Sequence, residues 1–128
     1  MPKTLYDTRF FLEHYYSPEA TILHKTREAI RTAKERFISA MVLHEIYWLT
    51  LETEGQETAE LRATLLEKDF KIVNVDAEIA KTSAQLRHKY RLNMANSVIA
   101  ATAAMLQATC LSDDPHFKGV GEIKTAWL

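Results

Sequence analysis

This sequence has little cysteine, glycine or proline: one cysteine, three glycines and three prolines in 128 residues. A single cysteine cannot close an internal disulfide, and the apolar neighbours of Cys110 predict a buried small hydrophobe and not a nucleophile. Three scattered glycines cannot build the glycine-rich loop that cradles phosphates in dinucleotide-binding and P-loop proteins. These shortages argue against disulfide, thiol and nucleotide-loop chemistry.

Long apolar runs are also missing, and the charge is balanced. No run approaches the roughly 18 residues that a membrane-spanning helix needs, and residues 1–4 lead into too few apolar residues for a signal peptide. The five histidines show no pair at metal-binding spacing, which argues against a zinc site. With a formal net charge of -1, any polyanion must be held by local charge. We therefore expect a cytoplasmic protein with no membrane partner.

Strand-like and helical patterns alternate along the chain. Short strands are predicted at residues 4–6, 37–39, 71–75, 109–112 and 123–127, and most of the intervals between them are long enough for crossover helices. With 47% hydrophobic and 26% charged residues, the chain is expected to fold as one domain over residues 1–128. The predicted fold class is α/β, with three α/β/α layers around a short central parallel sheet of about five strands.

The helical stretches differ in how they should pack. Residues 76–91 carry apolar residues on one face behind a predicted N-cap at Asp76, which predicts a helix covering one side of the sheet. Residues 98–106 have almost no polar face, which predicts a central helix buried on all sides. Gly55 is expected to end one helix before another at 58–67, whose Leu61 and Leu65 should face inward.

Two carboxylates, Asp7 and Asp114, each follow a predicted strand. In a parallel sheet such positions lie at the carboxyl edge, where ligands bind, so the two acids can converge on one divalent cation. Glu45 lies in an apolar helical stretch at 39–49, where it faces either solvent, beside Glu52, or a polar partner. Asn96 opens the buried helix and is either its N-cap or a fourth member of the site.

Four segments in order resemble a PIN domain of the small prokaryotic type, the VapC toxin half of VapBC toxin-antitoxin pairs, over nearly the whole chain. They are Tyr6-Asp7-Thr8, Leu43-His44-Glu45-Ile46, Asn96-Ser97-Val98-Ile99-Ala100-Ala101-Thr102-Ala103 and Ser112-Asp113-Asp114-Pro115-His116-Phe117. The resemblance implies a Mg²⁺- or Mn²⁺-dependent endoribonuclease acting on single-stranded or structured RNA. It also implies inhibition by a VapB-like antitoxin protein and a homodimer paired through surface helices, for which Tyr15, Tyr47 and Trp48 are available.

The same resemblance assigns roles to individual residues. Asp7 and Asp114 are expected to be the principal metal ligands, and Glu45 either ligates a second position or orients the attacking water. Thr8 and Ser112 either hold carboxylates or the scissile phosphate through their hydroxyls, or are structural turn residues.

Asn96 departs from the family, which carries Asp at this position. One negative charge fewer should weaken metal binding and lower or abolish cleavage. Three explanations stay open: an engineered silencing, a natural variant with weak activity, or a non-catalytic PIN-like module that binds RNA or an antitoxin-like protein. Asp113 could supply the missing charge, but as the neighbour of Asp114 in an extended segment it should point the other way.

A cationic stretch lies before Asn96. Between Glu78 and Asp113 there is no acidic residue, whereas Arg87, Lys89 and Arg91 fall within this interval. These side chains either bind RNA phosphates beside the metal or complement the C-terminal dipole of their own helix.

Overall fold

The protein, described here by a computed structural model over residues 3–128, is built on a five-stranded sheet whose order is β3-β2-β1-β4-β5 and whose paired strands are all parallel. The strands are β1 (Lys3–Tyr6), β2 (Glu35–Ser39), β3 (Lys71–Val73), β4 (Thr109–Leu111) and β5 (Lys124–Ala126). All five predicted strands are confirmed, with ends that shift by one or two residues. Residues 1 and 2, part of the segment behind the expectation of no signal peptide, lie outside the described residues.

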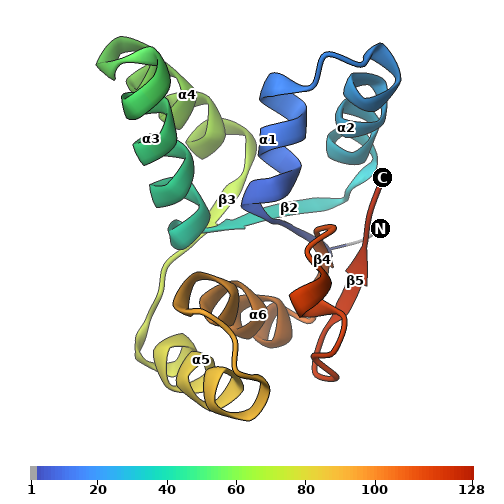
Figure 1. Cartoon of the computed structure of the whole chain (residues 1–128), viewed down its shortest axis with the longest axis vertical. Helices are drawn as coiled ribbons and strands as arrows, with labels where there is room; N and C mark the ends of the chain where they lie inside the picture. The colour runs from blue at the N-terminus through green and yellow to red at the C-terminus, as the bar shows by residue number, and fades with distance from the viewer. Residues whose placement is uncertain (1–2) are drawn as a thin grey trace.

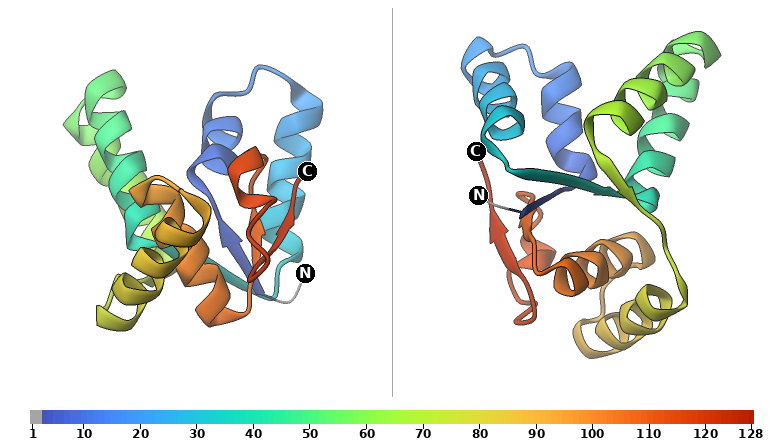
Figure 2. Two further views of the ribbon diagram at one scale, coloured as in Figure 1. Left: turned by 60° about the horizontal axis from the view of Figure 1, so that its bottom comes forward. Right: turned by 180° about the vertical axis from the view of Figure 1, so that it is seen from behind.

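Helices cover both faces of the sheet (Figure 1). Helices α1 (Thr8–Tyr16) and α2 (Ala20–Thr32) connect β1 to β2, and α3 (Ala40–Glu54) and α4 (Gln56–Asp69) connect β2 to β3. Helices α5 (Ala77–Tyr90) and α6 (Met94–Leu106) lie on the opposite side and lead to β4, which a short 3-10 helix, η1 (Pro115–Phe117), separates from β5. The predicted three-layer α/β/α class is confirmed (Figure 2). Within residues 3–128, no helix has the length and apolar character needed to span a bilayer.

The order of the strands reverses at β1. The chain steps outward from β1 to β2 and β3, and then returns to place β4 and β5 on the other side of β1. Tyr6 on β1 is in register with Leu111 on β4, and the backbone N–H of Asp7 donates to the Leu111 carbonyl at 3.3 Å. Adjacent strands whose connections diverge leave a crevice at their carboxyl ends, and ligands bind there in open α/β sheets. The fold thus places β1 and β4 at its switch point.

The core combines an aromatic cluster with a helix of small residues. Tyr6, Phe10, Phe11 and Phe70 meet edge to face with ring centroids 4.9 to 5.4 Å apart, an arrangement that aromatic quadrupoles favour. Residues 96–103 of α6 are all buried, which confirms the predicted core helix up to residue 103. Its end is not enclosed as predicted, because Met105 is 39% exposed.

Helix α5 begins as predicted but packs differently. The Asp76 carboxylate accepts from the backbone N–H of Ile79 at 2.8 Å, which confirms the N-cap. The helix packs chiefly against α6, where Ser83 and Ser97 are hydrogen bonded at 3.1 Å. Helix α6 therefore lies between α5 and the sheet, and the prediction that α5 covers the sheet itself was wrong (Figure 1).

The prediction for α4 was wrong in its rotation. Gly55, at φ +92°, ends α3 as expected, but Leu61 and Leu65 are 61% and 47% exposed. Helix α4 buries Ala59 and Leu66 instead. These two residues are seven apart and share one face, and the packing of α4 against α3 turns that face inward.

Candidate active site

Asp7 lies at the end of β1 and reaches across to β4. It occupies the N-cap position of α1, yet its side chain makes no capping hydrogen bond. Its Oδ2 accepts instead from the Ser112 hydroxyl at 2.6 Å, and the residue is only 3% exposed. Burial raises the pKa of Asp7, the Ser112 hydrogen bond opposes this rise, and the negative charge of Glu45 adds to it. A buried carboxylate is therefore held at the switch point by the Ser112 hydroxyl, and the backbone N–H groups of Thr8 and Arg9 also oppose the rise in its pKa.

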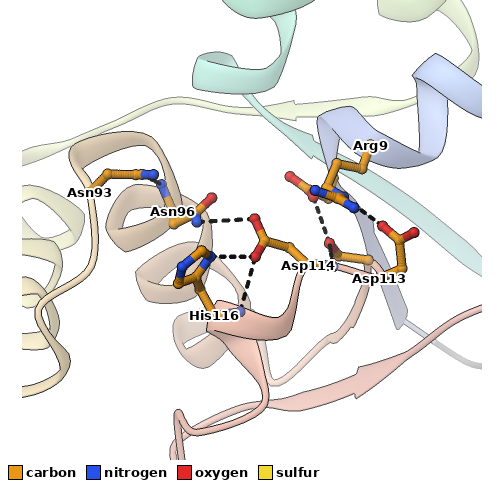
Figure 3. Close-up of polar contacts among 8 residues, drawn as sticks. Arg9, Asn93, Asn96, Asp113, Asp114 and His116 are labelled. Atoms are coloured by element: carbon orange, nitrogen blue, oxygen red, sulfur yellow. Dashed lines mark hydrogen bonds and ion pairs between the residues drawn. The ribbon is translucent and has the colours of Figure 1, made fainter.

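Asp114 lies on the other side of Ser112. Its backbone N–H donates to the Ser112 hydroxyl at 3.1 Å, and its Oδ2 accepts from the Asn96 amide at 3.3 Å. Its Oδ1 accepts from the backbone N–H of His116 at 2.9 Å and contacts the His116 ring at 2.6 Å (Figure 3). Burial alone would raise the pKa of Asp114, but the hydrogen bonds from His116 and Asn96 hold it below its ordinary 3.8.

Glu45 approaches from α3. It is half-buried, and its Oε1 accepts from the Thr8 hydroxyl at 2.6 Å, whereas Glu52 is exposed. The alternative in which Glu45 shares a solvent face with Glu52 was therefore wrong. Adjacent residues at the start of α1 thus reach in two directions, Asp7 toward β4 and Thr8 toward α3.

The N-cap alternative for Asn96 was wrong, because Asn93 caps α6. The Asn93 side chain accepts from the backbone N–H of Asn96 at 2.8 Å. Asn96 lies in the first turn, 8% exposed, where its carboxamide reaches Asp114. Figure 3 shows Asn96 between Asn93 and Asp114. Asn96 is therefore not the cap of α6, and its side chain faces Asp114 instead.

The structure brings Asp7, Glu45, Asn96 and Asp114 to one edge of the sheet, and these four residues form the acidic cluster. Hydroxyls and the amide link them, in the order Glu45–Thr8 and Asp7–Ser112–Asp114–Asn96. Among residues 3–128, no three Asp, Glu, His or Cys side chains lie close enough to hold one metal ion together. Magnesium keeps several waters and needs only one or two carboxylates, so a donor set made of oxygens fits such an ion.

Arg87, Lys89 and Arg91 precede Asn96 in the chain but do not join this cluster. They are exposed at the end of α5 and in the short loop that leads to Asn93 and α6. The Lys89 ammonium lies 3.2 Å from Glu122, and the hydrogen bonds within residues 3–128 join none of the three to the acidic cluster.

The sequence patterns missed Arg9 and His116. The Arg9 Nε donates to Asp113 at 2.6 Å, so Asp113 points to α1 while Asp114 faces α6, as expected for neighbours in an extended segment. The signal for Arg9 is its place in the first helical turn, where a cation opposes the helix dipole.

An apolar groove of about 430 Å³ opens beside Glu45, between α1, α3 and the start of α6. Its lining includes Leu12, Trp48 and Met94, which are 37%, 56% and 59% exposed. Large apolar side chains exposed together are typical of a surface that binds a partner.

Known proteins share the family model and the fold of this chain. The family model of the PIN domain matches residues 4–123. No curated protein sequence matches the chain.

Several solved structures share the fold. VapBC2 from Rickettsia felis, bound to a promoter DNA fragment, has a TM-score of 0.80 at 14% identity, with 98% of each chain covered. DNA-bound VapBC from Salmonella typhimurium has a TM-score of 0.80 at 14% identity, with 99% of this chain and 98% of that chain covered. VapC20 from Mycobacterium tuberculosis, a toxin that cleaves the sarcin-ricin loop, has a TM-score of 0.73 at 17% identity, covering 92% and 95%. At these identities the likeness is one of fold.

Proposed function

This chain belongs to the PIN domain family, and from that premise we propose that it is a metal-dependent endoribonuclease of the VapC toxin type acting on single-stranded or structured RNA. The observation that carries the proposal is the meeting of Asp7 and Asp114 around Ser112 at the switch point of the sheet. Distant acids at such a point are suited to a divalent cation and a phosphate.

The donor chemistry favours Mg²⁺ or Mn²⁺. Asp7 and Asp114 would be the principal ligands, directly or through water, and Glu45 would serve a second position or orient a water. When bound, such an ion lowers the pKa of a water and offsets the charge that builds on the phosphate during hydrolysis.

Hydroxyls hold the acids in position for this role. Ser112 donates to Asp7 and accepts from the Asp114 backbone, so one side chain fixes the distance between the two acids. Thr8 donates to Glu45 and ties α3 to the start of α1. Charged groups held by neutral donors keep their orientation without losing their charge, which favours preorganisation.

Asn96 lowers the charge of the cluster. Its amide nitrogen donates to the carboxylate of Asp114, where an Asp would add negative charge. We expect weaker metal binding and weaker cleavage than an Asp at this position would support. The same contact favours a second candidate function, a non-catalytic PIN-like module that binds RNA or an antitoxin-like protein.

Arg87, Lys89 and Arg91 are proposed to bind RNA phosphates on the flank of the site. They are exposed cations beside the loop that enters α6. Each phosphate contact would add to affinity and to its salt dependence.

A VapB-like antitoxin is the proposed protein partner. The groove beside Glu45 has an apolar lining suited to an extended segment, and its end at the acids suits a cationic side chain. The similar structures from Rickettsia felis and Salmonella typhimurium are VapBC assemblies.

We also propose a homodimer in the cytoplasm. Among the three aromatic residues expected at its interface, Trp48 is strongly exposed, whereas Tyr47 is bonded to Glu60 and Tyr15 lies under Arg62. Light scattering of the purified chain would report its mass in solution.

The test is cleavage of single-stranded RNA in Mg²⁺ or Mn²⁺ by the wild type, Asn96→Asp and Asp7→Asn. We expect weak cleavage by the wild type, more by Asn96→Asp and none by Asp7→Asn, which controls for contaminating nuclease. Absence of cleavage by both the wild type and Asn96→Asp would overturn the nuclease and favour the binding module.

A further inference from the structure

Arg9 is a cation placed where the helix does not favour one. It lies in the first turn of α1, two residues after Asp7, and its side chain is 49% exposed. The amino end of a helix carries partial positive charge, so an acid there is stabilising and a base is not. Local helix stability therefore gives no reason for an arginine at this position.

The ion pair of Arg9 with Asp113 orients the guanidinium more than it stabilises the fold. An exposed pair of this kind contributes little to stability, yet the Nε–Oδ1 contact of 2.6 Å fixes one edge of the guanidinium. Within residues 3–128, the terminal nitrogens of Arg9 make no hydrogen bond. Two parallel N–H donors on a planar group match two oxygens of a phosphate.

The guanidinium also lies in the field of the site. The hydrogen bond to Asp113 raises the pKa of Arg9, and the charges of Asp114 and Asp7 act in the same direction. Figure 3 shows Arg9 beside Asp113, with Asp114 nearby and its carboxylate directed toward Asn96 and His116. Arg9 is therefore a cation close enough to Asp7 and Asp114 to contact a phosphate bound between them.

We propose that Arg9 binds a phosphate of the RNA at the mouth of the site and that Asp113 is the positioning residue that holds it there. This inference rests on the proposed function, because it names the group that recognises the backbone of the same substrate. It requires no bound metal, so binding can be measured apart from cleavage.

The experiment measures binding of a fluorescein-labelled 2′-O-methyl single-stranded oligonucleotide in EDTA. EDTA removes the metal ion that the proposed cleavage needs, and the 2′-O-methyl backbone resists contaminating ribonucleases that attack through the 2′-hydroxyl. Arg9→Gln is expected to weaken binding about tenfold and to lower the slope of log K against log salt by about 0.7, the loss of one phosphate contact. Arg9→Lys keeps the charge but loses the paired N–H donors of the guanidinium, so its affinity should lie between those of the wild type and Arg9→Gln.

Arg31→Gln is the matched control. Arg31 also forms an exposed pair at 2.6 Å, with Glu28, but it lies near the end of α2, which leads to the amino edge of the sheet. Arg31→Gln removes the same charge far from the site and should leave the dissociation constant within about twofold of the wild-type value.

Asp113→Ala separates orientation from charge. Removing a negative charge beside a polyanion should tighten binding by simple electrostatics, and this is expected in the Arg9→Gln background. With Arg9 present, loss of its anchor should weaken binding instead. Tighter binding of Asp113→Ala in the wild-type background would overturn the positioning role.

The two proposals fail in different ways. If the wild type binds the oligonucleotide and Arg9→Gln binds it equally well, the role of Arg9 is overturned and the proposed function stands. If the wild type binds no RNA and cleaves none, both are overturned.

Discussion

Substitution of Asn96 by Asp tests the acidic cluster most directly, because it adds one charge to a site whose geometry is known. The Asn96 amide nitrogen lies 3.3 Å from the Asp114 Oδ2. Like charges at that distance repel by about 1 kcal/mol in water and about 5 kcal/mol at an effective dielectric constant of about 20. One of the two carboxylates can instead take up a proton. For a carboxyl of ordinary pKa this costs about 4 kcal/mol at neutral pH, which sets the upper limit of the destabilisation.

We therefore expect Asn96→Asp to lower the free energy of unfolding in EDTA by about 1 to 4 kcal/mol. A divalent cation between the carboxylates would relieve the same repulsion, so Mn²⁺ affinity should rise between roughly fivefold and a thousandfold. Urea unfolding in EDTA gives the first quantity, and calorimetric titration with MnCl₂ gives the second.

Asn93→Asp is the control on the same helix. Asn93 accepts from the backbone N–H of Asn96, and an Asp caps a helix as well as an Asn while complementing its dipole. Its stability in EDTA should be unchanged or slightly higher. If Asn96→Asp behaved like this control in both measurements, residue 96 would not face Asp114 in solution, and the cluster would not be the metal site.

Three further outcomes follow from the fold. Arg62→Ala should lower the free energy of unfolding by about 2 to 3 kcal/mol in urea denaturation, because Arg62 is 17% exposed, pairs with Glu54 at 2.8 Å and lies 4.1 Å above the Tyr15 ring. Burial holds the pKa of His14 below its ordinary 6.5, so the unfolded chain takes up a proton that the folded chain does not. The free energy of unfolding should therefore fall as the pH drops below 6.5. In urea denaturation, His14→Gln should show a smaller decrease of the midpoint between pH 8 and pH 5 than the wild type. Cys110 is buried, and burial raises its pKa, so Ellman's reagent should not react with the native protein but should detect one thiol per chain in urea. Fast reaction of the native protein would contradict the burial of Cys110.

Strand positions and the general fold class could be predicted because their signals are local. Short apolar runs separated by helix-length intervals are typical of parallel α/β sheets, and the carboxyl ends of such strands lie on one edge. That rule alone places Asp7 and Asp114 at the same edge of the sheet. The predicted core helix is likewise set by composition, because a helix without a polar face can only be buried.

Other features depend on how elements pack against one another. Leu61 and Leu65 are exposed because packing against α3, and not the sequence of α4 alone, determines which face of α4 is buried. The capping of α6 by Asn93 released Asn96 to face Asp114, although either Asn satisfies the composition of a cap.

The chain therefore encodes in its local patterns which acids reach the carboxyl edge, because strand ends and helix periods are properties of neighbouring residues. It does not encode locally which side chains meet there. Arg9 and Asp113 are 104 positions apart and pair only because β4 returns beside β1. That return depends on helix packing across the sheet, and such packing exists only once the whole domain has folded.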